Sequence, residues 1–157
     1  MMPTIRPYRD GDAEAMAEVY ERAIRAIGAR DYTPQQVDAW IGQGPRTERF
    51  RLRMTDGRRC WVAVDHANRV QAFIDLEADG HIDFLYAAPE LAGTGVARRL
   101  LAKVEEAAVS SGIGRLYVEA SEPARRFFLK HGFRVVERRD FERGGVPIHN
   151  YTMERRT

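Results

Sequence analysis

The sequence has little that would support a disulfide-linked, membrane-spanning or metal-binding protein. Its 157 residues include one cysteine, so no internal disulfide can form, which agrees with a reducing compartment. No run of 18 apolar residues is present, and the first residues lack the apolar core of a signal peptide. We therefore expect a cytoplasmic protein without membrane contact. The four histidines and the cysteine are scattered, and no metal site is expected.

An excess of one charge is also missing. The 25 Lys and Arg residues nearly balance the 23 Asp and Glu residues, for a net charge of +2. The basic residues are spread along the chain, so we expect no nucleic-acid partner. With 44% hydrophobic residues the chain can bury a core, but it is too short for two ordinary domains. We expect one domain over residues 1–157.

Hydrophobic periodicity and turn residues predict the order β-α-α-β-β-β-α-β-α-β-β. The predicted strands cover 4–8, 60–64, 70–76, 81–87, 116–120, 133–141 and 146–153. The predicted helices are 13–27, one that a Thr33–Gln36 capping box opens and 42–45 ends, 95–111, and one from Pro123 to before Gly132. This order predicts an α+β fold with a single mixed, mostly antiparallel sheet of about seven strands and helices on both faces. The strands 81–87 and 116–120 should be parallel, because a helix connects them.

A glycine-containing loop joins the strand 81–87 to the longest helix. It reads Ala92-Gly93-Thr94-Gly95-Val96-Ala97. Small residues before a helix N-terminus let unpaired backbone amides approach an anion such as a diphosphate. A tight turn with no ligand is the alternative. A nucleotide-binding domain is disfavoured, because the Walker lysine is absent and Arg98 stands where the dinucleotide fingerprint has its third glycine.

With this loop and a second segment, the chain resembles the GNAT superfamily of acetyl-CoA-dependent N-acetyltransferases. The second segment is Ser121-Glu122-Pro123-Ala124-Arg125-Arg126-Phe127-Phe128-Leu129-Lys130-His131-Gly132-Phe133, which matches the family's small polar residue, alanine, two aromatics and Gly-Phe. The two motifs occur in the family's order, separated by a helix and a strand. The match runs from about His81 to His131 and more loosely over the whole chain.

The resemblance implies a site for acetyl-CoA and no metal. Backbone groups of Leu85 and Ala87, on either side of Tyr86, would bind the pantetheine arm as an added strand. The loop from Ala92 to Ala97 would bind the diphosphate, with further charge from Arg98 and Lys130. Ser121, Phe127 and Phe128 would lie close to the pantetheine.

The chain departs from the family pattern at two positions. Ala92 replaces the usual Gln or Arg, which removes a side-chain donor to the phosphates. Phe128 stands where many members have the tyrosine that protonates the leaving thiolate. Residue 128 therefore cannot be a general acid, and Tyr86, Tyr117, Tyr151 or an ordered water could supply the proton instead.

Acetyl transfer to an amine also needs a base, for which three residues are candidates. Alternation along the strand 81–87 places His81 and Asp83 on one face with Leu85, and Ile82, Phe84 and Tyr86 on the other. We expect His81 to be the base, with Asp83 as its carboxylate partner. Glu119, near the end of the parallel strand, is the third candidate.

The sequence thus predicts an enzyme that transfers acetyl from acetyl-CoA directly to the amine of a small molecule or protein. The amine is not identified, although residues 28 to 55, which would shape its pocket, contain Trp40, Phe50 and several arginines. The alternatives are a different acyl chain and a non-catalytic acyl-CoA-binding module. A homodimer is left open.

Overall fold

The computed structural model describes residues 2–42 and 46–157. Its helices are α1 (Ala13–Ile27), α2 (Pro34–Ile41), α3 (Arg46–Met54), α4 (Val96–Ser110) and α5 (Glu122–Lys130). Its strands are β1 (Thr4–Pro7), β2 (Arg59–Val64), β3 (Val70–Leu76), β4 (His81–Ile82), β5 (Leu85–Ala87), β6 (Arg115–Ala120), β7 (Arg134–Arg143) and β8 (Val146–Arg156). The predicted capping box is present, because Thr33 and Gln36 exchange hydrogen bonds at the start of α2. The chain turns after α2 at Gly42 (φ 74°), and the rest of the predicted stop, 43–45, lies outside the described residues.

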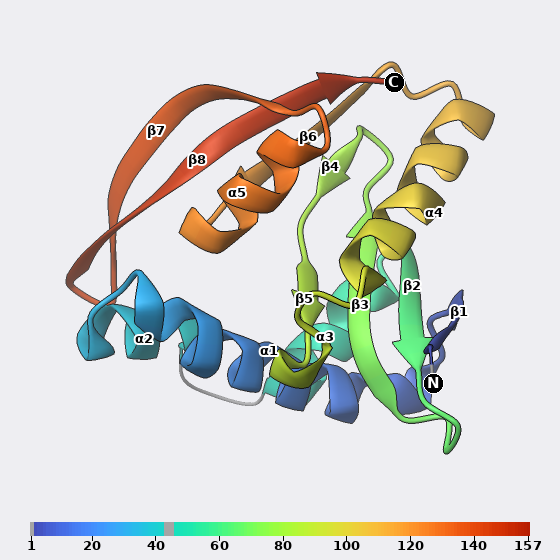
Figure 1. The fold of residues 1–157 in the computed structure, drawn as a ribbon, viewed down its shortest axis with the longest axis horizontal. Helices are drawn as coiled ribbons and strands as arrows, with labels where there is room; N and C mark the ends of the chain where they lie inside the picture. Colours follow the sequence, from blue (N-terminus) through green and yellow to red (C-terminus); the bar gives the residue numbers. More distant parts are fainter. Residues whose placement is uncertain (1, 43–45) are drawn as a thin grey trace.

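The α+β fold is confirmed, but the sheet is not continuous. The described strands form two four-stranded sheets with the orders β1-β2-β3-β5 and β4-β6-β8-β7. Pairing is antiparallel except between β4 and β6, which are parallel as predicted. In Figure 1 the second sheet arches across the top of the view, α4 stands on the right, and α1 and α2 run along the bottom.

The strand predicted over 81–87 is divided, which corrects the expected single sheet. The buried carboxylate of Asp75 accepts hydrogen bonds from the backbone amides of Asp83 (2.9 Å) and Phe84 (2.8 Å). These amides are therefore not available to a neighbouring strand. The expected alternation also fails across the break, because Ile82 and Leu85 pack with one apolar cluster while Phe84 packs with the other.

Two apolar clusters cover opposite faces of the first sheet. Trp61, Ala63, Ala72 and Ile74 point toward α4 and the second sheet. The alternate positions of β2 and β3, which include Val62 and Phe73, point toward α1 and α3. The period of two along each strand produces this division. The fold thereby places β5, the loop before α4 and α5 around one opening in the middle of the molecule.

Candidate active site

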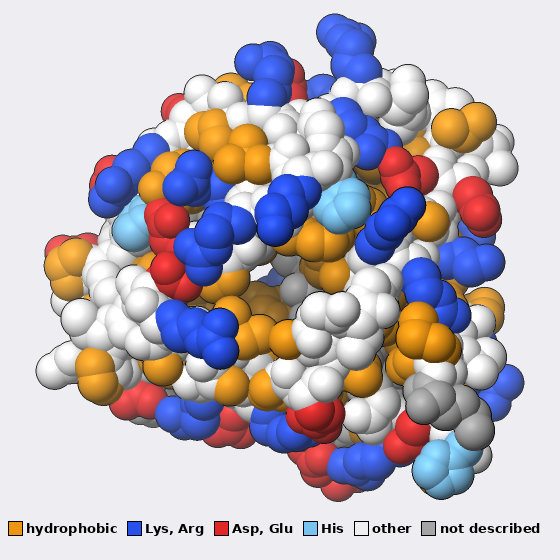
Figure 2. Space-filling model, viewed as in Figure 1, with side chains coloured by type: hydrophobic (Ala, Val, Ile, Leu, Met, Phe, Trp, Pro, Cys, Tyr) orange, Lys and Arg blue, Asp and Glu red, His pale blue; other side chains and the backbone are white. Residues whose placement is uncertain are grey.

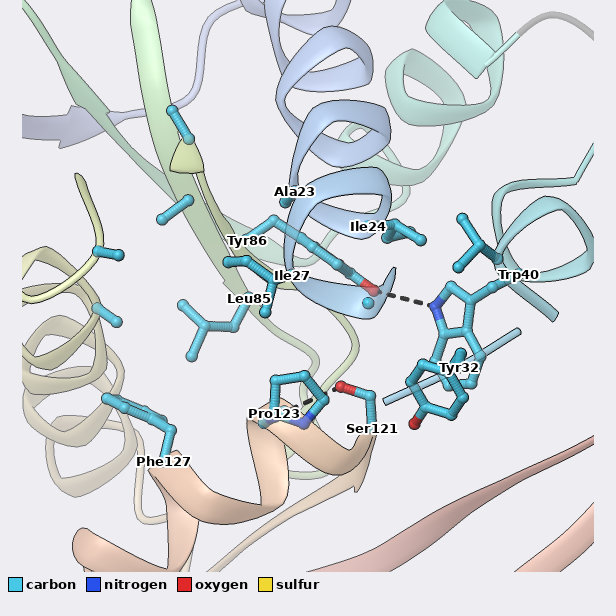
Figure 3. A pocket seen from close by; sticks show the side chains of 17 residues that line it. Ala23, Ile24, Ile27, Tyr32, Trp40, Leu85, Tyr86, Ser121, Pro123 and Phe127 are labelled. Atoms are coloured by element: carbon cyan, nitrogen blue, oxygen red, sulfur yellow. Dashed lines mark hydrogen bonds between the residues drawn. The ribbon is translucent and has the colours of Figure 1, made fainter. Parts of the chain in front are cut away.

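A cavity of about 200 Å³ lies between α1, α2, β5 and the start of α5; we call it the first cavity. Figure 2 shows this hollow in the middle of the face, with hydrophobic side chains in its floor and basic side chains around it. Figure 3 shows the lining residues. They are Ala23, Ile24, Ile27, Gly28, Tyr32, Val37, Trp40, Leu85, Tyr86, Ala87, Ala88, Ala92, Ala97, Ser121, Pro123, Ala124 and Phe127. Such a wall suits an uncharged, extended ligand more than an ionic one.

One wall of the first cavity is an open strand edge. Within the described part of the chain, β5 pairs with β3 on one side and with no strand on the other. Leu85 and Ala87 of this strand both line the cavity. The backbone groups on the open side can therefore pair with the amides of an extended ligand, as an additional strand would.

The glycine loop at the mouth of the first cavity presents unpaired amides. Gly93 and Gly95 adopt positive φ angles of 78° and 84°, which place Gly95 at the N-terminus of α4. Among the described residues, no acceptor is found for the backbone N–H groups of Gly93, Gly95, Val96, Ala97 and Arg98. Unpaired amides and the positive end of the helix dipole together favour a bound anion. The loop therefore fits the diphosphate site expected from the sequence.

A second cavity of about 230 Å³ shares Trp40 and Tyr86 with the first. The indole Nε1 of Trp40 donates a hydrogen bond to the Tyr86 hydroxyl across 3.4 Å, as Figure 3 shows. Burial raises the pKa of Tyr86, so its hydroxyl keeps its proton. The second cavity is lined by Tyr20, Trp40, Ile41, Arg46, Arg49, Phe50, Arg53, Asp83, Phe84, Tyr86, Glu119, Arg143 and Asn150. Tyr86 thus stands where two ligands, one in each cavity, would meet.

His81 lies between two carboxylates and lines neither cavity. Its Nε2 is 2.5 Å from Oε2 of Glu119, and its Nδ1 is 2.7 Å from Oε1 of Glu77. Burial opposes the charged imidazole, but Glu119 and Glu77 outweigh it and raise the pKa of His81 to about 9. The same hydrogen bond lowers the pKa of Glu119. At neutral pH His81 is therefore a cation paired with Glu119, and Glu119 is the member of the pair that lines the cavity.

This pairing predicts a pH dependence of stability. The pKa of His81 in the folded state lies above its ordinary value of 6.5. The His81–Glu119 pair therefore stabilises the native state fully below about pH 6.5, and this stabilisation is lost as pH rises through about 9. We expect the free energy of unfolding of wild type to exceed that of His81→Asn by on the order of 2 to 3 kcal/mol at pH 6, and by much less at pH 10. Urea unfolding at both pH values measures the difference. An equal difference at both would contradict the assignment of charge to His81.

Asp83 does not pair with His81, contrary to expectation. Its carboxylate lies 2.9 Å from Nη1 of Arg58 and 3.1 Å from Nη1 of Arg53. Arg58 also contacts Asp75 at 2.6 Å. Arg58 is therefore shared between Asp75, whose carboxylate divides the strand, and Asp83, which lines the second cavity. The strand break turns Asp83 toward these arginines.

Comparison with known proteins decides the family. A family model described as an acetyltransferase (GNAT) domain matches residues 28–155. The chain belongs to the GNAT acetyltransferase family. It is 30% identical over 149 residues to an uncharacterized N-acetyltransferase, YafP, of Escherichia coli K12, covering 95% of this chain and 93% of that protein. The predictions of superfamily, fold class and acetyltransferase enzyme are confirmed.

Two solved structures of GNAT proteins extend this similarity. A GCN5-related N-acetyltransferase from Rhodopseudomonas palustris superposes with a TM-score of 0.91 at 29% identity, covering 100% of this chain and 97% of that one. The PaiA N-acetyltransferase from Thermoplasma acidophilum, in complex with coenzyme A, gives 0.80 at 20% identity and full coverage of both chains. The Thermoplasma acidophilum structure shows that the two proteins share the same fold.

The structure brings most of the GNAT site residues predicted from the sequence to the first cavity. Seven of them line it, namely Leu85, Tyr86, Ala87, Ala92, Ala97, Ser121 and Phe127. Gly93, Thr94, Gly95 and Val96 form the loop beside it, and the exposed Arg98 and Lys130 have no ion-pair partner among the described residues. Thr94 bonds to the carbonyl of Leu91 through both its amide and its hydroxyl.

Phe128 lies away from both cavities in the described structure. It is fully buried and packs against Phe127 and Phe133, with ring centroids 5.2 and 4.8 Å apart. The position at which many GNAT proteins have a tyrosine thus contributes here to the apolar core. Its expected contact with the pantetheine stays a prediction.

Sequence reasoning named only part of the residues around the two cavities. Ile24 and Ile27 line the first cavity, and Arg143 and Asn150 line the second, although we did not expect this from the sequence. Arg46, Arg49 and Arg53 also line the second cavity, and they belong to the segment 28–55 whose arginines we expected near the acceptor pocket. The apolar stripe of α1 continues to Ile27, beyond what a sheet would need to cover, and the arginines recur at helical spacing over 46–53. These two patterns were the available signals. Among the described residues no group of histidine, cysteine or carboxylate side chains could hold a metal ion, and no helix could cross a bilayer.

Proposed function

We propose that the chain, acting as one N-acetyltransferase domain, transfers an acetyl group from acetyl-CoA directly to an amine while both are bound. The observation that carries this proposal is the meeting of two different cavities at Tyr86. The first has an open strand edge and unpaired loop amides, which suit a pantetheine arm and a diphosphate. The second is lined by the carboxylates of Asp83 and Glu119, which suit an amine.

The residues present fit acetyl-CoA. The apolar wall around Leu85 and Phe127 would enclose the pantetheine. Ala92 has no side-chain donor for the phosphates, so the diphosphate would bind to the unpaired amides of Gly93 and of Gly95 to Arg98. The thioester supplies the acetyl group. GNAT proteins of the same fold from Thermoplasma acidophilum and Sinorhizobium meliloti are described as complexes with coenzyme A and acetyl-CoA, which supports the assignment.

Two residues would move the protons of the reaction. A protonated amine loses two protons when its nitrogen bonds to the acetyl carbon and the carbon–sulfur bond breaks. We assign one to Glu119, which lines the second cavity and would pass the proton to solvent directly or through water. The departing thiolate would gain one proton from the hydroxyl of Tyr86, which lines both cavities and is protonated before the reaction. The second proton of the amine would pass, directly or through water, to the Tyr86 phenolate that this transfer leaves.

Of the other candidate residues, His81 and Asp83 have supporting parts, whereas Tyr117 and Tyr151 have none. His81 positions Glu119 and does not itself face either cavity. Tyr117 bonds to Asp79, and Tyr151 packs against His149 away from both cavities, so neither replaces Tyr86. Asp83 is placed to attract the ammonium form of the amine before its proton is lost.

Release of free thiol tests the proposal. With acetyl-CoA and a panel of primary amines, we expect CoA to appear at a rate that depends on the amine, together with an equal amount of acetylated product detected by mass spectrometry. A parallel series with longer acyl-CoA thioesters tests the choice of acyl chain. Stabilisation of the protein by acetyl-CoA with no thiol release for any amine would favour the non-catalytic binding module instead.

A further inference from the structure

The second cavity has a basic wall that the transfer of acetyl to an amine does not require. Arg46, Arg49 and Arg53 follow one another at three and four residues along α3, so they lie on one face of this helix and line the cavity. Arg143, near the end of β7, lines it as well. Four guanidinium groups from two separate elements therefore surround one small space.

Carboxylates near this wall pair with Arg46 and Arg53 but, among the described residues, not with Arg143. Arg46 pairs with Glu21 at 2.8 Å. Arg53 pairs with Asp83, but that carboxylate lies closer to the better buried Arg58. The other lining carboxylate, Glu119, pairs with the cationic His81 through its Oε2. Within the described part of the chain, Arg143 has no ion-pair partner.

The second sheet contributes a different kind of group to the same cavity. Glu119 on β6 and Asn150 on β8 both line it. Asn150 is only 7% exposed, and its side-chain Oδ1 is buried without a hydrogen-bond partner. Buried polar atoms are normally paired, so an orphaned acceptor in a cavity that a carboxylate also lines points to a ligand that donates N–H groups. An ammonium or amine group has that chemistry.

We propose that the acceptor is a small amine that also carries a carboxylate or another oxyanion, as a free amino acid does. Its nitrogen would lie between Glu119 and Asn150, within reach of Tyr86. Its anionic group would bind the guanidinium groups of α3 and of Arg143, which match the two oxygens of a carboxylate. This inference rests on the proposed function, because it assigns the second cavity to the acceptor.

The aromatic side chains favour a small ligand of this type. Tyr20, Phe50 and Phe84 pack against one another with centroids 5.1 to 6.3 Å apart and form an apolar side of the cavity. The guanidinium of Arg53 lies over the ring of Phe84 at 5.6 Å, which holds its charge beside the cavity. An amine with a short carbon chain between its two charged ends would contact both walls and this apolar side.

Matched pairs of amines test the inference. Each pair is an amino acid and its carboxamide, which differ in the negative charge, and kcat/KM for thiol release is measured for both. We expect the carboxylate member to be preferred, and Arg143→Gln to reduce its kcat/KM about tenfold to a hundredfold while changing the carboxamide little. Arg138→Gln is the control on the same strand, because Arg138 pairs with Asp140 and does not line the cavity. Binding of the amino acid without acetyl-CoA, measured by calorimetry, should weaken in Arg143→Gln alone.

The outcomes separate this inference from the proposed function. Equal use of the two members of every pair, with thiol released, would overturn the anionic acceptor and leave acetyl transfer standing. Equal losses in Arg143→Gln and Arg138→Gln would also overturn it. Absence of thiol release with every amine, together with absence of amino-acid binding, would overturn both.

Discussion

Replacement of Gly95 by valine is expected to abolish the stabilisation of the protein by acetyl-CoA. Gly95 has a φ of 84° at the start of α4, and a Cβ placed there would meet no protein atom within 4 Å. The valine side chain would therefore enter the open space in front of the loop amides, where we place the diphosphate. It would also strain the backbone that aims those amides. At a hundredfold excess over Kd, wild type should gain about 2.7 kcal/mol, or roughly 5 to 10 °C in Tm.

Gly112→Val provides the matched control for this experiment. Gly112 follows the other end of α4, has a φ of 70°, and would also place its Cβ in open space. Both variants should lose similar stability without ligand, because both place a β-branched residue in the left-handed region. Thermal unfolding with and without acetyl-CoA separates strain from binding. An undiminished shift in Gly95→Val would show that the diphosphate binds elsewhere.

Glu119→Gln is expected to lower kcat by about 10² to 10⁴ with a smaller change in KM. The amide has nearly the shape of the carboxylate but cannot take the proton of the amine. Because His81 lowers the pKa of Glu119, the wild-type activity should persist to acid pH and fall only below the usual range of a glutamate. Steady-state kinetics at saturating acetyl-CoA, repeated from about pH 3 to about pH 9, measures both effects.

Glu77→Gln tests whether the effect of Glu119 is due to proton transfer. Glu77 bonds to the other nitrogen of the same His81 ring and does not line either cavity. The Glu77→Gln variant, like Glu119→Gln, removes one of the two carboxylates that bond to the His81 ring. We expect it to leave kcat close to that of wild type. Equal losses in the two variants would mean that the charge of His81, and not Glu119, governs the rate.

The sequence was sufficient to predict the features of the fold that depend on residues close together in the chain. Capping at Thr33, the glycine loop from Gly93 to Gly95 and the parallel pairing of β4 with β6 all follow from local patterns or chain connectivity. Helix α3 was not predicted, because Phe50 and Met54 are its only buried residues and most of the others are charged. A weak apolar stripe does not identify a helix whose arginines face a cavity.

The interactions that decide the candidate site come from distant parts of the chain. Strand alternation near His81 cannot show that the carboxylate of Asp75 divides this strand. It also cannot show that Glu119, 38 residues away, is the carboxylate that bonds to the imidazole. Sequence alone therefore favoured His81 as the base, whereas its hydrogen bond to Glu119 and its pKa of about 9 support our proposal that it positions Glu119.

The first sheet separates two apolar clusters, and this arrangement links their folding. Alternate residues of β2 and β3, such as Trp61 and Val62, belong to opposite clusters. Separation of these two strands would expose both clusters to water together, so we expect the two clusters to unfold together. The α1–α3 side and the α4 side, with the glycine loop, should therefore share a single unfolding transition.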